Sequence, residues 1–230
     1  MFSRMLSRSS GVLSKIYTHP FNQQMRSGTL PDKTFAFYLE QDALYLRDFS
    51  KALKTIANRL SDERHRQHFM RFSEQMIASE RKLHQKYRKE VLPLTFFMHK
   101  PEKIPVIAAY TDHLLHAAHN APVAVSVASC IPCFWVYNEL GKQMSDHCHQ
   151  ENRYRPWIAS YSGSNFTSST RSIVQIIHEL TADVACHKLQ AHISYAFVKS
   201  LECELDFFDA AMAGRKSEAI RRPCIPWSGL

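Results

Sequence analysis

The sequence predicts an all-α fold, a single-domain helical bundle of about seven or eight helices. Apolar residues recur with helical spacing along several segments, which is the main sequence signal for amphipathic helices. Six glycines in 230 residues are few for the tight turns of a β-sandwich or barrel. One short segment, residues 123–127, alternates as a strand would, but the sequence offers it no partner strand. These observations favour helices throughout and give no sign of a second domain.

The first sixteen residues allow two interpretations. They contain three basic residues, five serines and no acidic residue, which resembles the composition of a mitochondrial targeting segment. Their apolar residues also have the spacing of a first amphipathic helix. We expect the packed core to span about residues 17–213, and the basic, proline-containing tail, residues 214–230, to lie outside it.

Helix starts in the first half of the chain are marked by proline and acidic residues. A proline followed by an aspartate at residues 31–32 begins a helix whose apolar stripe continues to Leu53. An acidic pair at residues 62–63 begins a second helix, and Pro93 ends that region. A linker framed by two further prolines then leads into the second half.

The second half is expected to contain five more helices. The pattern predicts a helix over 107–119, a buried helix from 123 through Pro132, a short helix ending at 161, and helices over 166–184 and 186–212. Because proline inside a helix removes a hydrogen bond and clashes with the preceding turn, a kink at Pro132 is expected.

Composition argues against several classes of protein. The net charge is +8, but acidic residues interrupt even the densest basic region, residues 59–89, which favours a solvated helix face over a nucleic-acid site. Six cysteines are too sparse for a disulfide scaffold and suit reduced thiols in a cytoplasmic protein. No apolar run approaches eighteen residues, so no transmembrane helix is expected. We therefore expect neither a nucleic-acid nor a membrane partner.

Three of the expected helices carry a chemically distinctive pair of residues within an apolar stripe. The pairs are Asp42 with Tyr45, Cys133 with Tyr137, and Glu204 with Phe207. A core-facing carboxylate is costly unless it is paired or hydrogen-bonded. The carboxylates therefore share a polar pocket with the thiol and the tyrosines, or they pair with basic residues; spacing alone leaves both interpretations open. Cys133 and Tyr137 are likewise consistent with a reactive site or with plain core.

Other candidate ligands give a weaker signal. His113, His116 and His119 recur every three residues, but no carboxylate adjoins them in sequence, so we expect them to be exposed or hydrogen-bonded. Polar residues at positions 179, 183 and 187 would need matching ligands on a second helix. Cys130 precedes Cys133 by one turn; it is either a small buried residue or the partner of Cys133 in an inhibitory disulfide. We predict no metal site.

Several ordered segments resemble one known family, the TenA family (thiaminase II, aminopyrimidine aminohydrolase). The resemblance is carried by residues 19–21, 28–31, 37–46, 132–141, 157–161 and 204–211. It implies a heme-oxygenase-like bundle, no cofactor and a homotetramer. It also implies thiamin salvage by hydrolysis at the exocyclic methylene carbon of an aminopyrimidine or of thiamin.

The resemblance also implies a role for each matching residue. Cys133 corresponds to the nucleophile, Glu204 to the general acid/base, and Asp42 to the carboxylate that binds the pyrimidine edge. The remaining matches line the pocket: Tyr45, Tyr110, Tyr137, Tyr161 and Phe207. Phe208 stands where many members have tryptophan, which alters packing but removes no reactive group.

Two alternatives remain open at the level of sequence. The first is a non-catalytic pyrimidine-binding or regulatory member of the same fold, for which a basic net charge would allow a nucleic-acid partner. The second is a metal-dependent oxygenase on a related bundle. Turnover of a pyrimidine by metal-free protein would distinguish the hydrolase from both.

Overall fold

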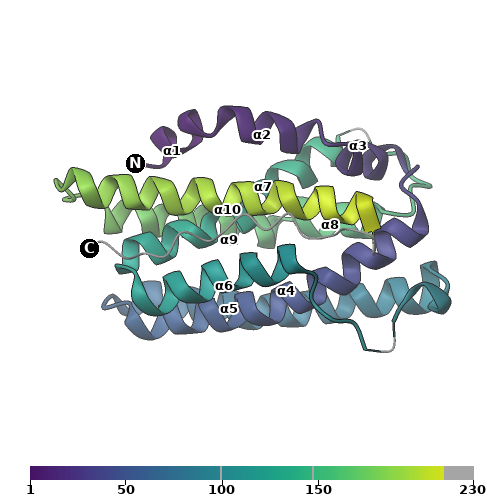
Figure 1. Cartoon of the computed structure of the whole chain (residues 1–230), viewed down its shortest axis with the longest axis horizontal. Helices are drawn as coiled ribbons and strands as arrows, with labels where there is room; N and C mark the ends of the chain where they lie inside the picture. Colours follow the sequence, from purple (N-terminus) through teal and green to yellow (C-terminus); the bar gives the residue numbers. More distant parts are fainter. Residues whose placement is uncertain (99, 147, 215–230) are drawn as a thin grey trace.

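The computed structural model describes residues 1–98, 100–146 and 148–214, and within these ranges the protein is helical with no strand. Long helices run side by side along the molecule (Figure 1). They are α4 (Asp32–Arg59), α5 (Glu63–Lys86), α6 (Pro105–Asn120), α7 (Val123–Ser145), α9 (Ser164–Leu180) and α10 (His187–Ala213). The all-α helical bundle predicted from the sequence is therefore confirmed. Most of the tail at residues 214–230 lies outside the described residues.

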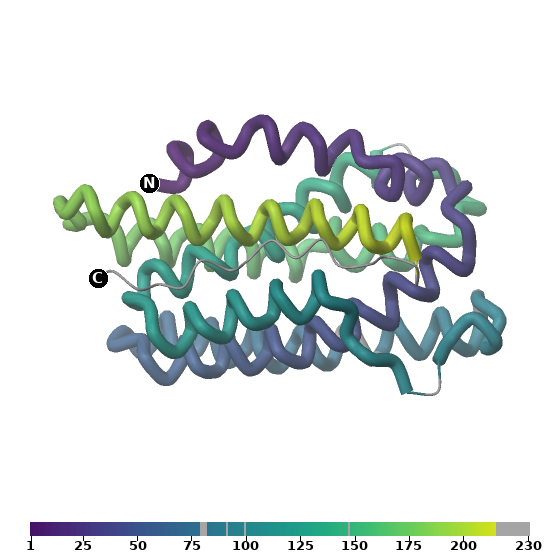
Figure 2. The backbone as a smooth tube through the Cα atoms, in the orientation of Figure 1, coloured from purple at the N-terminus to yellow at the C-terminus, as the bar shows by residue number. Residues whose placement is uncertain are grey.

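The described helices outnumber the seven or eight expected, because the N-terminal segment is divided into three short ones. These are α1 (Phe2–Arg8), α2 (Ser10–Tyr17) and α3 (Pro20–Ser27). Figure 2 shows this segment lying along α10, in agreement with its packing against that helix. Phe2 and Met5 are buried in the common core, which therefore reaches further toward the N-terminus than the expected start near residue 17.

Helix starts lie close to where the sequence placed them. Pro31 is the N-cap of α4, and Asp62 caps α5 by accepting hydrogen bonds from the backbone N–H groups of Arg64 and His65. One π-helical turn, η1 (Tyr87–Val91), follows α5, and the 3-10 turn η2 (Leu94–Phe96) begins just after Pro93. The second half adds the short helix α8 (Arg155–Ser162) between α7 and α9.

The ninth helix ends four residues earlier than expected, at Leu180 rather than Val184. Its C-cap, Thr181, donates a side-chain hydrogen bond of 2.7 Å to the carbonyl of Ile177. Such side-chain bonds compete with the backbone pattern that would continue the helix. Positions 183 and 187 consequently do not extend the face of α9 that carries Glu179.

The central helix of the bundle is α7, which packs against α8, α9 and α10 and contains Pro132 within its length. It is long and apolar enough to cross a membrane, with a mean hydropathy of 1.3 over its most apolar window, although no continuous apolar run suggested this. Because 83% of that window is buried inside the protein, the helix has the environment of a core helix.

Close packing of α7 against α8 depends on Gly141. A Cβ atom added at this glycine would lie 2.7 Å from the backbone nitrogen of Ser162 and 2.8 Å from the carbonyl carbon of Tyr161. Both atoms belong to backbone, so they cannot yield as a side chain tip would. We expect Gly141→Ala to lower the free energy of unfolding by roughly 1–3 kcal/mol, measured by urea denaturation. Gly11→Ala is the matched control, since nothing lies within 4 Å of its added Cβ.

Candidate active site

The structure gathers the candidate residues in the interior between α4, α6, α7 and α10. Glu204 is 1% exposed and Tyr110 is fully buried. The other buried members are Asp42, Tyr45, Cys133, Tyr137 and Phe207, whereas Tyr161 on α8 is partly buried. Because these side chains come from helices far apart in sequence, their proximity is a property of the fold. The site is a buried polar cluster surrounded by aromatic rings.

The carboxyl group of Glu204 is almost completely shielded from solvent. The hydroxyl of Tyr110 donates a 2.8 Å hydrogen bond to its Oε1. Burial raises its pKa to about 8, although interactions with the Tyr110 and Tyr137 hydroxyls partly oppose the shift. The nearby charge of Asp42 raises the pKa further. Glu204 is therefore mostly protonated at neutral pH and is suited to act as a general acid.

Cys133 is a thiol rather than a thiolate in this environment. Burial raises its pKa well above the usual range, and the negative charge of an ionised Glu204 raises it again. The nearby Tyr45 hydroxyl lowers the pKa of Cys133. The hydroxyl oxygen of Tyr45 is itself buried without a hydrogen-bond partner of ordinary geometry. Cys133 and Glu204 are thus electrostatically coupled, and ionising one disfavours ionising the other.

Aromatic rings enclose this coupled pair. Tyr45 and Tyr110 have ring centroids 4.9 Å apart, and Tyr38 stacks on Phe207 at 5.0 Å. The Tyr38 hydroxyl also donates a 3.3 Å hydrogen bond to the hydroxyl of Tyr137. Rings with polar edges can hold an aromatic ligand by its faces while their hydroxyls meet its polar atoms.

An open cavity of about 820 Å³ lies beside the buried cluster, between α4, α5, α8 and α9. Of the candidate residues, Asp42 and Tyr161 line it, whereas Cys133, Glu204 and the other tyrosines are packed behind it. Tyr161 lines the cavity and packs against Tyr137, with their ring centroids 5.0 Å apart. The structure therefore brings the candidates together but divides them between a cavity wall and a closed interior.

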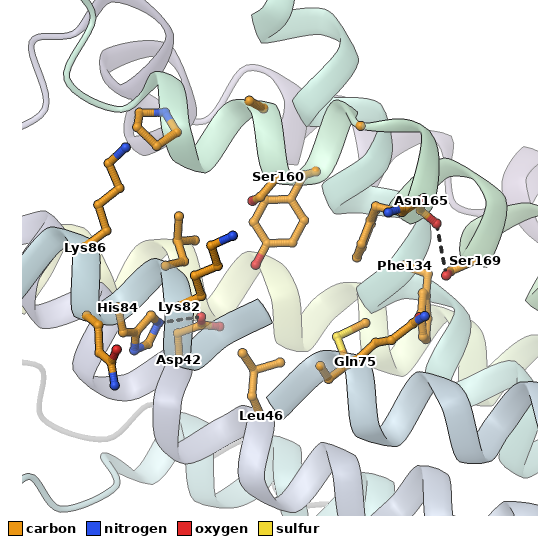
Figure 3. Close-up of a pocket in the computed structure, with 18 of the residues that line it drawn as sticks. Asp42, Leu46, Gln75, Lys82, His84, Lys86, Phe134, Ser160, Asn165 and Ser169 are labelled. Carbon is orange, nitrogen blue, oxygen red and sulfur yellow. Dashed lines mark hydrogen bonds and ion pairs between the residues drawn. The ribbon is translucent and has the colours of Figure 1, made fainter. Parts of the chain in front are cut away.

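His84 of α5 also lies at the inner end of the cavity. Its Nε2 is 3.4 Å from the Asp42 carboxylate, and both side chains are largely buried (Figure 3). A histidine at this position provides a partner for Asp42, as the basic-pairing interpretation expects. Glu204, by contrast, is hydrogen-bonded to Tyr110, as the pocket interpretation expects.

Sequence reasoning missed His84 and the role of Tyr38. His84 belongs to the charged stretch that was interpreted as a solvated helix face, and no spacing rule links it to α4. Tyr38 lies one turn before Asp42, so its place on the same helix face was a usable signal. What the sequence did not contain was the pairing of Tyr38 with Tyr137, which is 99 positions away.

The remaining candidate ligands do not form a cluster. No group of three metal-ligating side chains occurs among the residues that the structure describes. His113 is buried, with its Nε2 3.1 Å from the Ser200 hydroxyl, and burial lowers its pKa to about 4. Cys130 is fully buried, which agrees with the packing interpretation, and burial raises its pKa to about 12. It and Cys133 are both free thiols.

The fold and the site together define a class of protein: all-α helical bundles with a thiol and a carboxyl group buried among aromatic rings. The chain belongs to the TENA/THI-4/PQQC family, whose model matches residues 8–214. The solved structure of a TenA homologue from P. horikoshii OT3 superposes with a TM-score of 0.81 at 26% identity, covering 93% of this chain and 98% of that one.

The chain is also similar in sequence to two proteins of very different length. The aminopyrimidine aminohydrolase of Bacillus subtilis (strain 168) is 29% identical over 202 residues, which are 87% of this chain and 84% of that protein. The thiamine biosynthesis multifunctional protein ThiED of Corynebacterium efficiens is 31% identical over 211 residues. The match covers 91% of this chain but only 28% of that longer protein.

Proposed function

We propose that this protein is an aminopyrimidine aminohydrolase of the thiaminase II type, working in thiamin salvage. The observation that carries the proposal is the coupled pair of Cys133 and Glu204, buried among tyrosines beside a cavity lined by Asp42. The aminopyrimidine aminohydrolases among the relatives support the same activity. We extend the proposal to a cytoplasmic homotetramer that needs no cofactor, on the basis of the family resemblance.

Recognition of the pyrimidine is assigned to Asp42 and the aromatic side chains. The substrate, 4-amino-5-aminomethyl-2-methylpyrimidine, presents an amino group and a ring nitrogen side by side on one edge. A carboxylate can accept a hydrogen bond from the amino group and interact with the adjacent protonated nitrogen. Tyr38, Tyr45 and Phe207 supply apolar faces for the ring. Entry from the cavity requires the side chain of Tyr161 to rotate aside.

The proposed chemistry begins with a proton relay through Glu204. Glu204 gives its proton to a ring nitrogen, which makes the ring electrophilic, and its carboxylate then takes the proton of the Cys133 thiol as sulfur bonds to a ring carbon. Electrons returning from the ring expel the group on the methylene carbon, as ammonia from the protonated aminomethyl group or as the neutral thiazole from thiamin. Water adds to that carbon and releases a proton to solvent. Sulfur then departs and takes up the proton of the ring nitrogen, which restores the aromatic ring and the free thiol.

Atoms and charges balance over the cycle. The aminomethyl substrate and water give the hydroxymethyl pyrimidine and ammonia. Thiamin and water give the same pyrimidine, the neutral thiazole and a proton. Nothing is oxidised or reduced, so the proposed cycle needs no oxidant or reductant.

A two-substrate assay tests the proposal. Purified protein is incubated with the aminomethyl pyrimidine and, separately, with thiamin, and the hydroxymethyl pyrimidine is quantified by liquid chromatography and mass spectrometry. We expect product from at least one substrate, in the presence or absence of a metal chelator. Absence of product from both would overturn the assignment as a hydrolase.

A non-catalytic pyrimidine-binding protein is the second candidate. The specific observation in its favour is that Cys133 and Glu204 do not line the open cavity, whereas Asp42 does. Calorimetric titration with the hydroxymethyl pyrimidine measures binding, and together with the turnover assay it distinguishes the two functions. Tight binding without turnover of either substrate would favour the binding protein.

A further inference from the structure

The cavity beside the active site has two ends of opposite character. Its inner end carries the buried side chains of Asp42 and His84. Its outer part carries Lys82, Lys86 and Lys89, all of them exposed. Figure 3 shows the side chains of Lys82 and Lys86 extending into the cavity from α5. The cavity therefore has a buried carboxylate–histidine pair at its base and a row of lysines at its opening.

The three lysines face the cavity together because of their spacing. They lie at positions i, i+4 and i+7, which places side chains on one face of α5 and its continuation into η1. Among the side chains that the structure describes, no acidic group forms an ion pair with any of the three lysines, and Glu90 is an acidic residue that lines the cavity nearby. Three like charges facing one opening raise the positive potential there and favour the approach of an anion.

The opposite wall is also electropositive. It contains Ser164 and Asn165 at the start of α9, a helix of 17 residues with no acidic residue in its first turn and no side-chain cap. The positive end of a helix dipole and free backbone N–H groups favour an anion there. The outer cavity thus presents positive charge from two sides.

We propose that the outer cavity binds a phosphate ester on the leaving group of the substrate, so that phosphorylated thiamin is preferred over thiamin. The inference rests on the proposed function. With the pyrimidine held at Asp42, the thiazole and its hydroxyethyl arm extend from the methylene carbon toward the opening, where a phosphate meets the lysines. A cavity of about 820 Å³ is large for a single pyrimidine ring but suits such an extended molecule.

The proposed reaction leaves the phosphate untouched. The bond that breaks joins the methylene carbon to the thiazole nitrogen, and the water oxygen ends on the methylene carbon. The thiazole departs with its phosphate ester intact. The lysines therefore act in binding and specificity.

Relative rates on thiamin and thiamin monophosphate test the proposal. We expect kcat/KM for thiamin monophosphate to exceed that for thiamin by about tenfold at low ionic strength, and salt to reduce the ratio. In Lys82→Ala/Lys86→Ala/Lys89→Ala the ratio should fall to near one. The matched control is Lys15→Ala/Lys54→Ala/Lys188→Ala, which removes the same charge from exposed positions outside the cavity and should keep the wild-type ratio.

Failure of this inference can be told apart from failure of the proposed function. Turnover of thiamin with no preference for its phosphate, or an equal change in both triple variants, overturns the phosphate site alone. If neither compound is turned over, calorimetric titration of the wild type decides: tighter binding of thiamin monophosphate than of thiamin sustains the site, and equal affinity overturns it. Inorganic phosphate is titrated in parallel, and its binding as tightly as the ester would mean a site for free phosphate instead.

Discussion

Replacement of Cys133 by alanine is expected to abolish hydrolysis while the protein still folds and binds the pyrimidine. In the proposed mechanism the thiol attacks the ring and leaves again, so its loss should lower kcat by at least ~10³-fold. Asp42 and the aromatic rings remain in place, so the dissociation constant for the hydroxymethyl pyrimidine should change little. Steady-state kinetics and calorimetry measure the two effects.

Cys130→Ala is the matched control for this experiment. Cys130 lies one turn earlier on α7, is also buried and is also a free thiol. The group nearest to it in polar contact is the Ser129 hydroxyl, 4.0 Å from its sulfur, so its loss should affect packing and not turnover. Turnover by Cys133→Ala at the wild-type rate would rule out the nucleophile, and equal losses in both variants would point to packing as the cause.

The fold was largely predictable because helical periodicity is a property of short stretches of sequence. The start of α5 illustrates this, since Asp62 signals its cap within three residues of sequence and forms that cap in the structure. The end of α9 was not predicted, because it depends on whether the Thr181 side chain turns back to the carbonyl of Ile177. Boundaries of this kind are decided by single side chains and carry no periodic signal.

The site was only partly predictable. Spacing showed that Asp42 and Glu204 lie on core-facing positions but left open whether they share a pocket or pair with basic groups. The structure gives a different outcome for each: Asp42 approaches His84, and Glu204 is bonded to Tyr110. The resemblance pointed to the acids but not to their partners, because contacts between residues 42 and 94 positions apart depend on tertiary packing.

Replacement of Glu204 by glutamine should remove most activity and also a pH dependence of stability. Glutamine keeps the shape of the side chain and can still accept the hydrogen bond of Tyr110, but it cannot transfer a proton. We expect kcat/KM to fall by about 10²–10⁴-fold. In the wild type, kcat/KM should decline above about pH 8, where Glu204 loses the proton that the proposed mechanism requires. A pH profile of kcat/KM for both proteins measures these effects.

The same pKa predicts how stability responds to pH. In the unfolded chain Glu204 ionises near its usual value of 4.5, whereas burial holds the proton in the folded protein until about pH 8. Between these values the folded state binds more protons than the unfolded state, so the free energy of unfolding falls as pH rises. Glu204→Gln lacks this titration and should gain roughly 2–5 kcal/mol relative to the wild type between pH 5 and pH 8. The free energies of unfolding are obtained from urea denaturation of both proteins at several pH values. If the difference between them did not change from pH 5 to pH 8, the raised pKa would be contradicted. If the residual activity of Glu204→Gln declined near pH 8 as in the wild type, that decline would belong to another group.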